Sequence, residues 1–383
     1  MAFFHPFESY ERANAVLGEG LRDGVFPGFV AGVWSLDYPN SFEFAWGGHR
    51  RMNSKGLAEL PMERDTIFDL ASLTKVFATS ALAMTLIERG WIQWDTPVRS
   101  ILPNFRHAGV TLKHLASHTS GLPAWYPLFE KMRESFHRDD LETLPIKIRQ
   151  EAMRKLVFGI DLERSVGTKA VYSDLGFLTL GFALEEVTGL PLDQAVMRFV
   201  WRPMGLSERG RTGPYFVHTN QAVFRARDDR VAATEDSAWR HGVIQGQVHD
   251  DNCWAMGGYG GHAGAFGTAE DLLLYGKKFF SGYFSRMNLQ AAWTRVADPG
   301  DCERTPGWDT PSGNSPAFGK TFSSKSVGHL GFTGTSFWID PENGKVVTLL
   351  TNRVHPTREN TLIKSFRGKF HEALATDLRV GLD

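Results

Sequence analysis

Strand-like segments of this chain are confined to its two ends, and this placement constrains the fold more than any other feature. Near the N-terminus, an amphipathic segment over residues 7–23 precedes two extended, largely apolar runs that begin at Gly28 and Phe42. Near the C-terminus, the runs 334–340 and 345–352 are separated by the sequence Pro-Glu-Asn-Gly, whose Asn-Gly pair is typical of a hairpin turn. Because strands need partners, we expect both ends to share one antiparallel sheet.

The middle of the chain has mainly helical periodicity. Helices are predicted at residues 72–87, 111–117, 146–157, 174–187, 192–201 and 269–280, and a closing helix at about 360–378. We therefore expect a mixed α/β fold in which helices flank the sheet and a mainly helical lobe is inserted. The expected single unit covers residues 7–379, with an α/β lobe at about 7–80 and 268–379 and a helical lobe at about 81–267. Residues 298–326 lack periodicity and predict an irregular loop, which either borders a functional site or is merely disordered.

Charge and composition narrow the classes of partner. The 42 basic and 43 acidic residues give a formal net charge of −1, which provides no field to attract nucleic acid or an anionic membrane. A small-molecule or peptide-like partner is the better expectation. Glu8 and Glu11 stand where a signal peptide needs apolar residues, so we expect a cytoplasmic protein. Cys253 and Cys302 have no metal-binding spacing and are interpreted as free thiols, so we expect no metal site at these cysteines. The oligomeric state is not predicted.

One short motif has the spacing that nucleophilic catalysis needs. Ser72 and Lys75 form the S-x-x-K of Ala-Ser-Leu-Thr-Lys at the start of the predicted apolar helix, which places hydroxyl and amine one turn apart on one face. A serine hydroxyl needs a base, and burial can lower the pKa of a lysine enough to help. The helix N-terminus adds N–H groups where an oxyanion would form. Alone, the motif fits an ordinary surface helix equally well.

Two further motifs follow in order, and together they identify a family. The triplet Tyr-Ser-Asp ends at Asp174, and His-Leu-Gly begins at His329. Four longer segments add to this pattern. They are DTPVRSILP from Asp95, LASHTSGLP from Leu115, GGHAGAFGTAEDL from Gly260 and GFTGTSFWIDPENG from Gly331. With S-x-x-K, this set resembles the serine β-lactamase and penicillin-binding-protein superfamily, whose motifs are S-x-x-K, Y-x-N or S-x-N, and K-T-G. The nearest branch is the class C β-lactamase-like one, which includes esterases, D-amino-acid-specific peptidases and amide hydrolases.

The resemblance covers essentially the whole chain and implies a β-lactamase-like fold and a cofactor-free serine acyl hydrolase. It implies that Ser72 is the acyl-enzyme nucleophile, that Lys75 is its amine partner and that Tyr172 carries the proton. The oxyanion hole would consist of the backbone N–H groups of Ser72 and Phe332, and Gly331 would lie beside the substrate. A carboxylic ester, an amide or a D-amino-acid peptide would be the substrate.

Two departures from the β-lactamase pattern shift the expected substrate. Asp174 stands where a neutral Asn is usual, so an amide donor becomes an acceptor when ionised, and it could instead hold Lys75 protonated. His329 stands where Lys is usual, and an ordinary pKa near ~6.5 gives it at most a partial positive charge at neutral pH, increasing toward pH 6. Both changes weaken the expected binding of a substrate carboxylate and favour esters or uncharged amides.

Three other features of the sequence each allow two interpretations. Trp125 and Tyr126 could form an aromatic wall of the pocket or pack between lobes. His262 could line the cleft or hydrogen-bond its glycine-rich loop. The run His249 to Asp251 could be a metal site of an amidohydrolase, although no zinc-type spacing accompanies it. Three alternative functions stay open. They are a β-lactamase or DD-carboxypeptidase, a catalytically silent binding module on the same fold, and the metal-dependent amidohydrolase.

Overall fold

The computed structural model describes residues 3–53, 56–207, 213–220, 229–312 and 322–380. Its main sheet has seven antiparallel strands in the order β1-β3-β2-β12-β11-β10, with β4 paired to β3. The strands are β1 (Phe4–His5), β2 (Gly28–Ser35), β3 (Phe42–Arg51), β4 (Leu60–Pro61), β10 (Val327–Leu330), β11 (Ser336–Asp340) and β12 (Lys345–Thr351). The first and last thirds of the chain meet where β2 pairs with β12, from Phe29 opposite Thr351 to Ser35 opposite Lys345. The predicted antiparallel sheet built from both chain ends is confirmed.

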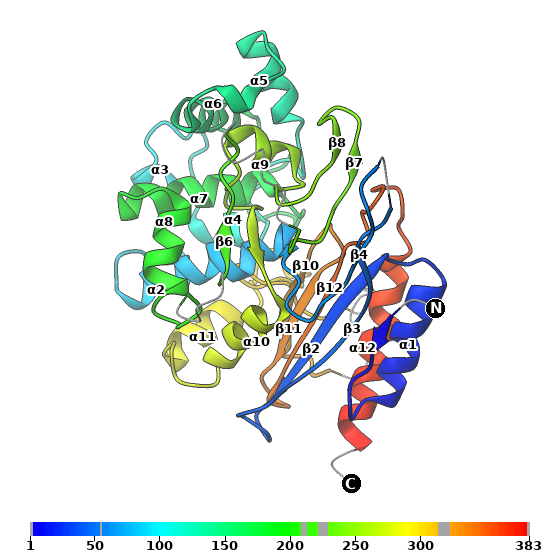
Figure 1. The fold of residues 1–383 in the computed structure, drawn as a ribbon. Coiled ribbons are helices and arrows are strands. Elements are labelled where there is room, and N and C mark those ends of the chain that lie inside the picture. The colour runs from blue at the N-terminus through cyan, green and yellow to red at the C-terminus, as the bar shows by residue number, and fades with distance from the viewer. Residues whose placement is uncertain (1–2, 54–55, 208–212, 221–228, 313–321, 381–383) are drawn as a thin grey trace.

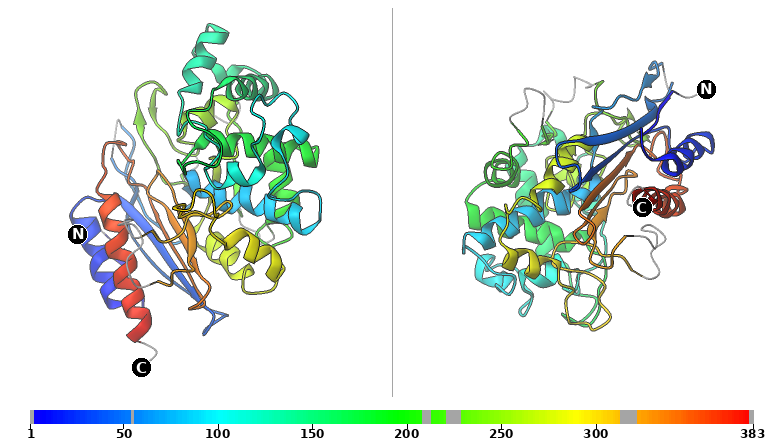
Figure 2. Two further views of the ribbon diagram at one scale, coloured as in Figure 1. Left: turned by 180° about the vertical axis from the view of Figure 1, so that it is seen from behind. Right: turned by 90° about the horizontal axis from the view of Figure 1, so that it is seen from below.

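Two helices cover one face of this sheet, and the other helices gather on the opposite face (Figure 1). Helices α1 (Glu11–Arg22) and α12 (Ile363–Val380) lie side by side, as Figure 2 shows from behind. Consecutive side chains of β11 point to opposite faces, so Trp338 packs toward α1 and α12 whereas Phe337 packs toward the helical side. The sheet is therefore buried on both faces, which explains why β2, β11 and β12 are largely apolar.

The helical side contains the predicted helices other than the closing one, and several more. On this face α10 (Ala269–Lys278) packs against β2 and β12. The other elements are η1 (Ala71–Leu73), η2 (Lys75–Ser80), α2 (Ala81–Glu88), α3 (Val98–Ile101), α4 (Leu112–Ala116), α5 (Leu128–Phe136), η3 (Leu141–Thr143), α6 (Ile146–Gly159), α7 (Asp174–Thr188), α8 (Leu192–Val196), η4 (Met197–Trp201), α9 (Asp251–Met256) and α11 (Arg286–Trp293). In the short sheets, β9 (Ala265–Gly267) pairs with both β5 (Phe68–Asp69) and β6 (Tyr215–Phe216), and β7 (Asp236–Ser237) pairs with β8 (Gly242–Val243). The exact lobe boundaries remain predictions.

The structure differs from the predictions at three places. The helix expected from Ser72 begins as a 3₁₀ turn, continues as a π-helix over Lys75–Ser80 and becomes α-helical only at Ala81. His329 lies inside β10, a strand at the edge of the sheet that was not predicted. Helices α3, α5, α9 and α11 were not predicted. In the part of the chain that is described, no single helix is long and apolar enough to cross a membrane. One pair of helices has that length and apolarity when taken together, α7 and the segment Leu192–Trp201, but the pair is bent by 69°.

Candidate active site

Ser72 sits on a strained turn between β5 and η2. The preceding residue, Ala71, has φ of +48°, a left-handed conformation that residues with a Cβ adopt rarely. The buried Asp69 carboxylate holds this turn, because it accepts the backbone N–H groups of Ala71 at 2.8 Å and of His249 at 2.6 Å. Burial raises the pKa of Asp69. The nucleophile segment is thus held against the loop that carries His249.

The structure brings Ser72, Lys75 and Tyr172 together. The Ser72 Oγ lies 3.0 Å from the Lys75 Nζ and 2.7 Å from the Tyr172 hydroxyl oxygen. Lys75 is fully buried, and its ammonium also donates to Asp174 Oδ1 at 2.7 Å and to the His262 carbonyl at 3.1 Å. Asp174 is the first residue of α7, after Ser173 as N-cap. A serine oxygen within hydrogen-bonding distance of two proton-handling groups is the arrangement that nucleophilic catalysis needs.

The charges in this cluster decide its protonation state. Burial lowers the pKa of Lys75, but attraction to Asp174 and Tyr172 outweighs burial and raises the pKa above its ordinary value. Burial alone therefore does not give Lys75 a lowered pKa, contrary to the first expectation. The second expectation, that Asp174 holds Lys75 protonated, agrees with the direction of the net shift. For Tyr172, burial raises the pKa to about 12, although Lys75 acts in the opposite direction. The cluster at neutral pH contains an ammonium beside a carboxylate and a neutral phenol.

Two buried histidines flank the Tyr172 ring. The ring of His118 lies 4.7 Å and that of His329 5.8 Å from it, centroid to centroid. His118 Nδ1 accepts the Ser173 N–H, and His329 Nδ1 lies 2.7 Å from the Leu330 carbonyl oxygen. Because a carbonyl only accepts, His329 Nδ1 carries the proton, and within the described ranges its Nε2 has no hydrogen-bond partner. His118 was missed as a site residue, although it lies inside the LASHTSGLP segment.

Burial favours the neutral form of His329, which corrects the expectation that this residue gains positive charge toward pH 6. Burial lowers the pKa of His329 well below its ordinary value, and the charges of Lys75 and Arg304 lower it further. The pKa of His118 is lowered in the same way, first by burial and then by Arg304 and Lys75. Lowering the pH to 6 therefore does not supply a cation at His329. Its Nε2 presents an acceptor, whereas the lysine usual at this position presents a donor.

The turn after β10 packs directly against the nucleophile segment. Thr333 Oγ1 donates to the Asp69 carbonyl at 2.9 Å, and Thr335 Oγ1 donates to the Leu70 carbonyl at 3.1 Å. Gly331 has no room for a side chain, because a Cβ there would lie 2.0 Å from Thr335 Oγ1 and 2.8 Å from the Leu70 carbonyl oxygen. The chain at 331–332 is thereby held beside Ser72, where the sequence placed the second oxyanion-hole donor.

Part of this cluster opens into a cavity of about 550 Å³. Its walls include Ser72, Tyr172, Asp174, His329, Gly331 and Phe332. Trp125 also lines the cavity with half of its surface exposed, as expected of an aromatic wall. Tyr126 is not part of the lining, and its carbonyl instead accepts the Asn252 side chain, so its predicted place in the pocket is wrong. His262 borders the cavity, but its buried ring pairs with Asp250 at 2.9 Å.

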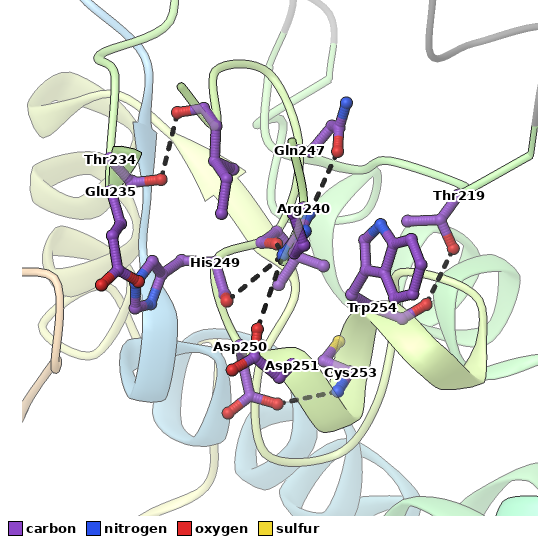
Figure 3. A network of polar contacts seen from close by, with 12 residues as sticks. Thr219, Thr234, Glu235, Arg240, Gln247, His249, Asp250, Asp251, Cys253 and Trp254 are labelled. Atoms are coloured by element: carbon purple, nitrogen blue, oxygen red, sulfur yellow. Dashed lines mark hydrogen bonds and ion pairs between the residues drawn. The ribbon is translucent and has the colours of Figure 1, made fainter. Parts of the chain in front are cut away.

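The possible metal site is divided among separate ion pairs, as Figure 3 shows for part of this network. The partners differ: His249 pairs with Glu235, Asp250 with His262, and Asp251 with Arg240 and Arg358. Burial opposes ionisation of Glu235, but hydrogen bonds from His249 and Arg358 lower its pKa to about 2. No group of three or more His, Cys, Asp or Glu side chains in the described ranges could hold a metal ion. Cys253 and Cys302 are free and buried, as predicted.

Comparison with known families decides the classification. The Beta-lactamase family model matches residues 14–368, a range that contains all three motifs. The chain belongs to the β-lactamase family. As a member of the β-lactamase family with Ser72 of the S-x-x-K motif in place, it is a serine hydrolase.

Several known proteins resemble this chain in sequence or in fold. A protein named putative D-alanyl-D-alanine carboxypeptidase from Escherichia coli (strain K12) is 30% identical over 346 residues, covering 81% of this chain and 75% of the relative. A protein of the same name from Salmonella enteritidis PT4 is 31% identical over 347 residues, covering 81% and 75%. The structure of EstCE1, a hydrolase with promiscuous acyltransferase activity, shares the fold with a TM-score of 0.68 and 22% identity, over 94% of this chain and 98% of that one. The penicillin-binding protein homologue from Pyrococcus abyssi has a TM-score of 0.68 and 21% identity, over 97% and 77%.

Proposed function

We propose that this protein hydrolyses carboxylic esters or uncharged amides through an acyl-enzyme on Ser72. The observation that carries the proposal is the position of the Ser72 Oγ, which contacts both Tyr172 and Lys75 and opens into the 550 Å³ cavity. A net charge of −1 supports a small-molecule or peptide-like acyl substrate over nucleic acid or a membrane. Residence in the cytoplasm and the absence of a cofactor stay predictions.

Tyr172 is the better acceptor for the Ser72 proton. Lys75 is held as an ammonium by Asp174 and has no lone pair to accept a proton. The Tyr172 oxygen lies 2.7 Å from the Ser72 Oγ, so a phenolate there can take the proton as the Oγ attacks the acyl carbon, and the phenol can return it to the leaving group. The Lys75 ammonium stabilises this phenolate because it favours the charged form. Water then repeats the sequence on the acyl group and releases the acid.

Asp174 makes this phenolate harder to form than an asparagine would. Burial is the largest cause of the raised pKa of Tyr172, and the negative charge of Asp174 raises this pKa further. Replacing Asp174 by Asn removes that contribution and leaves Lys75 with Tyr172 as its ionisable partner, so the pKa of Tyr172 must fall. We expect the alkaline rise of kcat/KM for p-nitrophenyl acetate to move to lower pH by on the order of one pH unit. A pH profile from 6 to 10 measures the shift.

The matched control is Asp161→Asn, which removes a mostly exposed carboxylate paired with Arg106 outside the cavity. This control should leave the pH profile unchanged, because exposed charges are screened. An Asp174→Asn profile that superimposes on that of the unmodified protein, or one that moves to higher pH, is incompatible with Tyr172 as the general base under the influence of Asp174.

A second candidate function, cleavage of a peptide that ends in D-alanine, is favoured by one cation in the cavity. Arg304 lines the cavity with its guanidinium 5.5 Å from the Tyr172 ring centroid. Its ion pair with Asp309 is loose at 3.4 Å, and its Nη1 has no hydrogen-bond partner among the described residues. The other cavity arginines are occupied: Arg353 and Arg367 by backbone carbonyls, and Arg358 by Glu235 and Asp251. Arg304 is therefore the group that could replace the missing motif lysine in binding a carboxylate.

Arg304→Met separates the two candidate functions. If Arg304 binds the substrate carboxylate, kcat/KM for a D-Ala-D-Ala peptide should fall by about 10- to 10²-fold, which corresponds to the loss of one charge-assisted hydrogen bond. Turnover of uncharged p-nitrophenyl acetate should change little, since this ester has no group for Arg304 to bind. The control Arg12→Met removes a comparable ion pair, 3.3 Å from Asp377, outside the cavity. If the unmodified protein leaves the peptide intact but hydrolyses the ester, the peptidase function is rejected.

A further inference from the structure

The turn that follows β10 is held by two arginines from distant parts of the chain. Arg367, on α12, donates from its Nη2 to the carbonyl oxygens of Gly331 at 2.6 Å and Thr335 at 2.8 Å. Arg353, just after β12, donates to the Phe332 carbonyl oxygen from its Nε at 2.8 Å and its Nη2 at 2.6 Å. Both arginines are buried. The peptide groups on both sides of Phe332 therefore have their carbonyl directions fixed by guanidinium groups.

Fixing these carbonyls also fixes the Phe332 N–H. The Gly331–Phe332 peptide is trans, so its C=O and N–H groups point in opposite directions. Its carbonyl accepts Arg367 Nη2 and also the Gly334 N–H at 3.1 Å, so the Phe332 N–H points away from both. Within the described ranges this N–H donates to no protein group, and Phe332 lines the same cavity as Ser72. A buried or cavity-facing donor without a partner is unusual unless a ligand uses it.

The charge of Arg367 has no compensating carboxylate among the described residues. Its hydrogen bonds go to backbone carbonyls, and its Nε has no partner. Burial and the charge of Arg353 lower the pKa of Arg367 to about 9, so it remains a cation at neutral pH. An uncompensated buried cation is destabilising, and a neutral side chain could fill the same volume without that penalty. A positive charge behind the peptide, however, stabilises negative charge in front of it and strengthens the N–H as a donor.

We propose that Arg367 and Arg353 are positioning residues that orient the Phe332 N–H as an oxyanion-hole donor and hold positive charge behind it. This inference rests on the proposed acyl-enzyme at Ser72. During attack the carbonyl oxygen of the substrate gains negative charge, which the Phe332 N–H binds. Both guanidiniums border the cavity, but the proposed effect works through the peptide groups on the two sides of Phe332 and needs no contact with the substrate. Arg353 also packs its guanidinium 4.4 Å from the Phe332 ring centroid, which restrains the same residue through its side chain.

The test compares Arg367→Met and Arg367→Lys with the unmodified protein. Three quantities are measured: kcat and KM for p-nitrophenyl acetate, the inhibition constant of phenylboronic acid, and the midpoint of thermal unfolding. A boronate bound to the Ser72 Oγ is tetrahedral and places one oxygen in the oxyanion hole, so it reports transition-state binding. For Arg367→Met we expect kcat to fall by about 10- to 10²-fold with KM nearly unchanged, and boronate affinity to fall by the same factor. Arg367→Lys, which keeps the charge, should recover part of both losses.

Arg149→Met is the matched control for loss of a buried arginine. Arg149 is also fully buried, and it donates to the Thr219 hydroxyl at 2.9 Å and to backbone carbonyls, far from the Gly331 turn in the sequence and outside the cavity lining. Its loss should lower the unfolding midpoint while boronate affinity stays within about two-fold. If Arg367→Met lowers the midpoint but preserves kcat and boronate affinity, Arg367 only joins α12 to the sheet and the proposal is overturned.

Two further outcomes remain decisive. If Arg367→Met does not fold, Arg367→Lys carries the test, because it should still lose kcat and boronate affinity together by about three- to ten-fold. Unchanged values for both quantities in Arg367→Lys would then reject the proposal. Ser72→Ala, measured in parallel, distinguishes failure of the underlying chemistry. If that variant keeps turnover and boronate affinity, the acyl-enzyme at Ser72 is wrong whatever Arg367 does.

Discussion

Replacement of Ser72 by alanine is expected to lower kcat/KM for p-nitrophenyl acetate by at least about 10⁴-fold, as happens when a catalytic nucleophile is removed. The same variant should lose covalent labelling by a fluorophosphonate probe, because Oγ is the atom that attacks phosphorus. Stability should change by no more than about 1–2 kcal/mol, since a small side chain leaves no large cavity and only Lys75 and Tyr172 lose a shared acceptor. Steady-state kinetics, labelling and thermal unfolding measure the three effects.

The control for this variant is Ser135→Ala, which removes an exposed hydroxyl that donates to the Lys131 carbonyl on α5. It should retain activity and labelling, so that any loss in Ser72→Ala reflects the position of the hydroxyl. A Ser72→Ala protein with ordinary activity would end the acyl-enzyme proposal.

Replacement of Tyr172 by phenylalanine is the second large effect. The ring packs between His118 and His329 and beneath the Lys75 ammonium, 4.9 Å from its centroid, and phenylalanine keeps these contacts. Only the hydroxyl at 2.7 Å from Ser72 Oγ is lost. We expect kcat to fall by at least about 10²-fold, within the usual range for a general acid–base group, with a smaller change in KM.

Tyr275→Phe is the matched control for that experiment. Tyr275 is also fully buried, and its hydroxyl donates to the Val76 carbonyl at 2.6 Å, inside the core and away from the cavity lining. Its loss should reduce stability by roughly 1–3 kcal/mol, because a buried carbonyl loses its partner, and should leave kcat largely intact. If Tyr172→Phe behaves like Tyr275→Phe, the proton must travel another way, for example through Lys75 alone.

Much of the fold could be predicted because the main elements have strong local patterns. The apolar runs after Gly28 and Lys345 belong to β2 and β12, which are buried on both faces, and the Asn-Gly pair marks the turn between β11 and β12. Strand β10 was not predicted because its four residues, beginning at Val327, include a glycine and a histidine and follow an irregular segment. Its strand conformation comes from pairing with β11, which is a tertiary interaction.

The active site, like the fold, was predictable where local sequence determines it and not where tertiary contacts do. Helix spacing placed Ser72 beside Lys75, and the family resemblance implied that Tyr172 joins them. The structure brings the Tyr172 hydroxyl and the Lys75 amine within hydrogen-bonding distance of the Ser72 Oγ. The direction in which the pKa of Lys75 moves depends on the balance between burial and two partners, which no spacing encodes. The neutrality of His329 likewise follows from burial beside Lys75 and Arg304.

Residues outside the motifs were the hardest to predict. Arg304 comes from the segment without periodicity, so nothing in its neighbourhood marked it as part of the cavity. Trp125 and Tyr126 are adjacent and chemically alike, yet only Trp125 lines the cavity. Arg367 has the pattern of an ordinary residue of the amphipathic helix α12, and its contact with the Gly331 turn becomes visible only when α12 is packed on the sheet. Side-chain direction at such positions is set by packing.

Mass spectrometry of the quenched reaction tests the central claim most directly. The protein is mixed with excess p-nitrophenyl acetate, quenched in acid during turnover, digested and mapped, with Ser72→Ala treated in the same way. The account predicts one acetyl group on the peptide that contains Ser72, formed as fast as the first p-nitrophenol is released and absent from the variant. Turnover without any acetylated peptide, or with the acetyl group on another residue at the rate of turnover, would contradict the account.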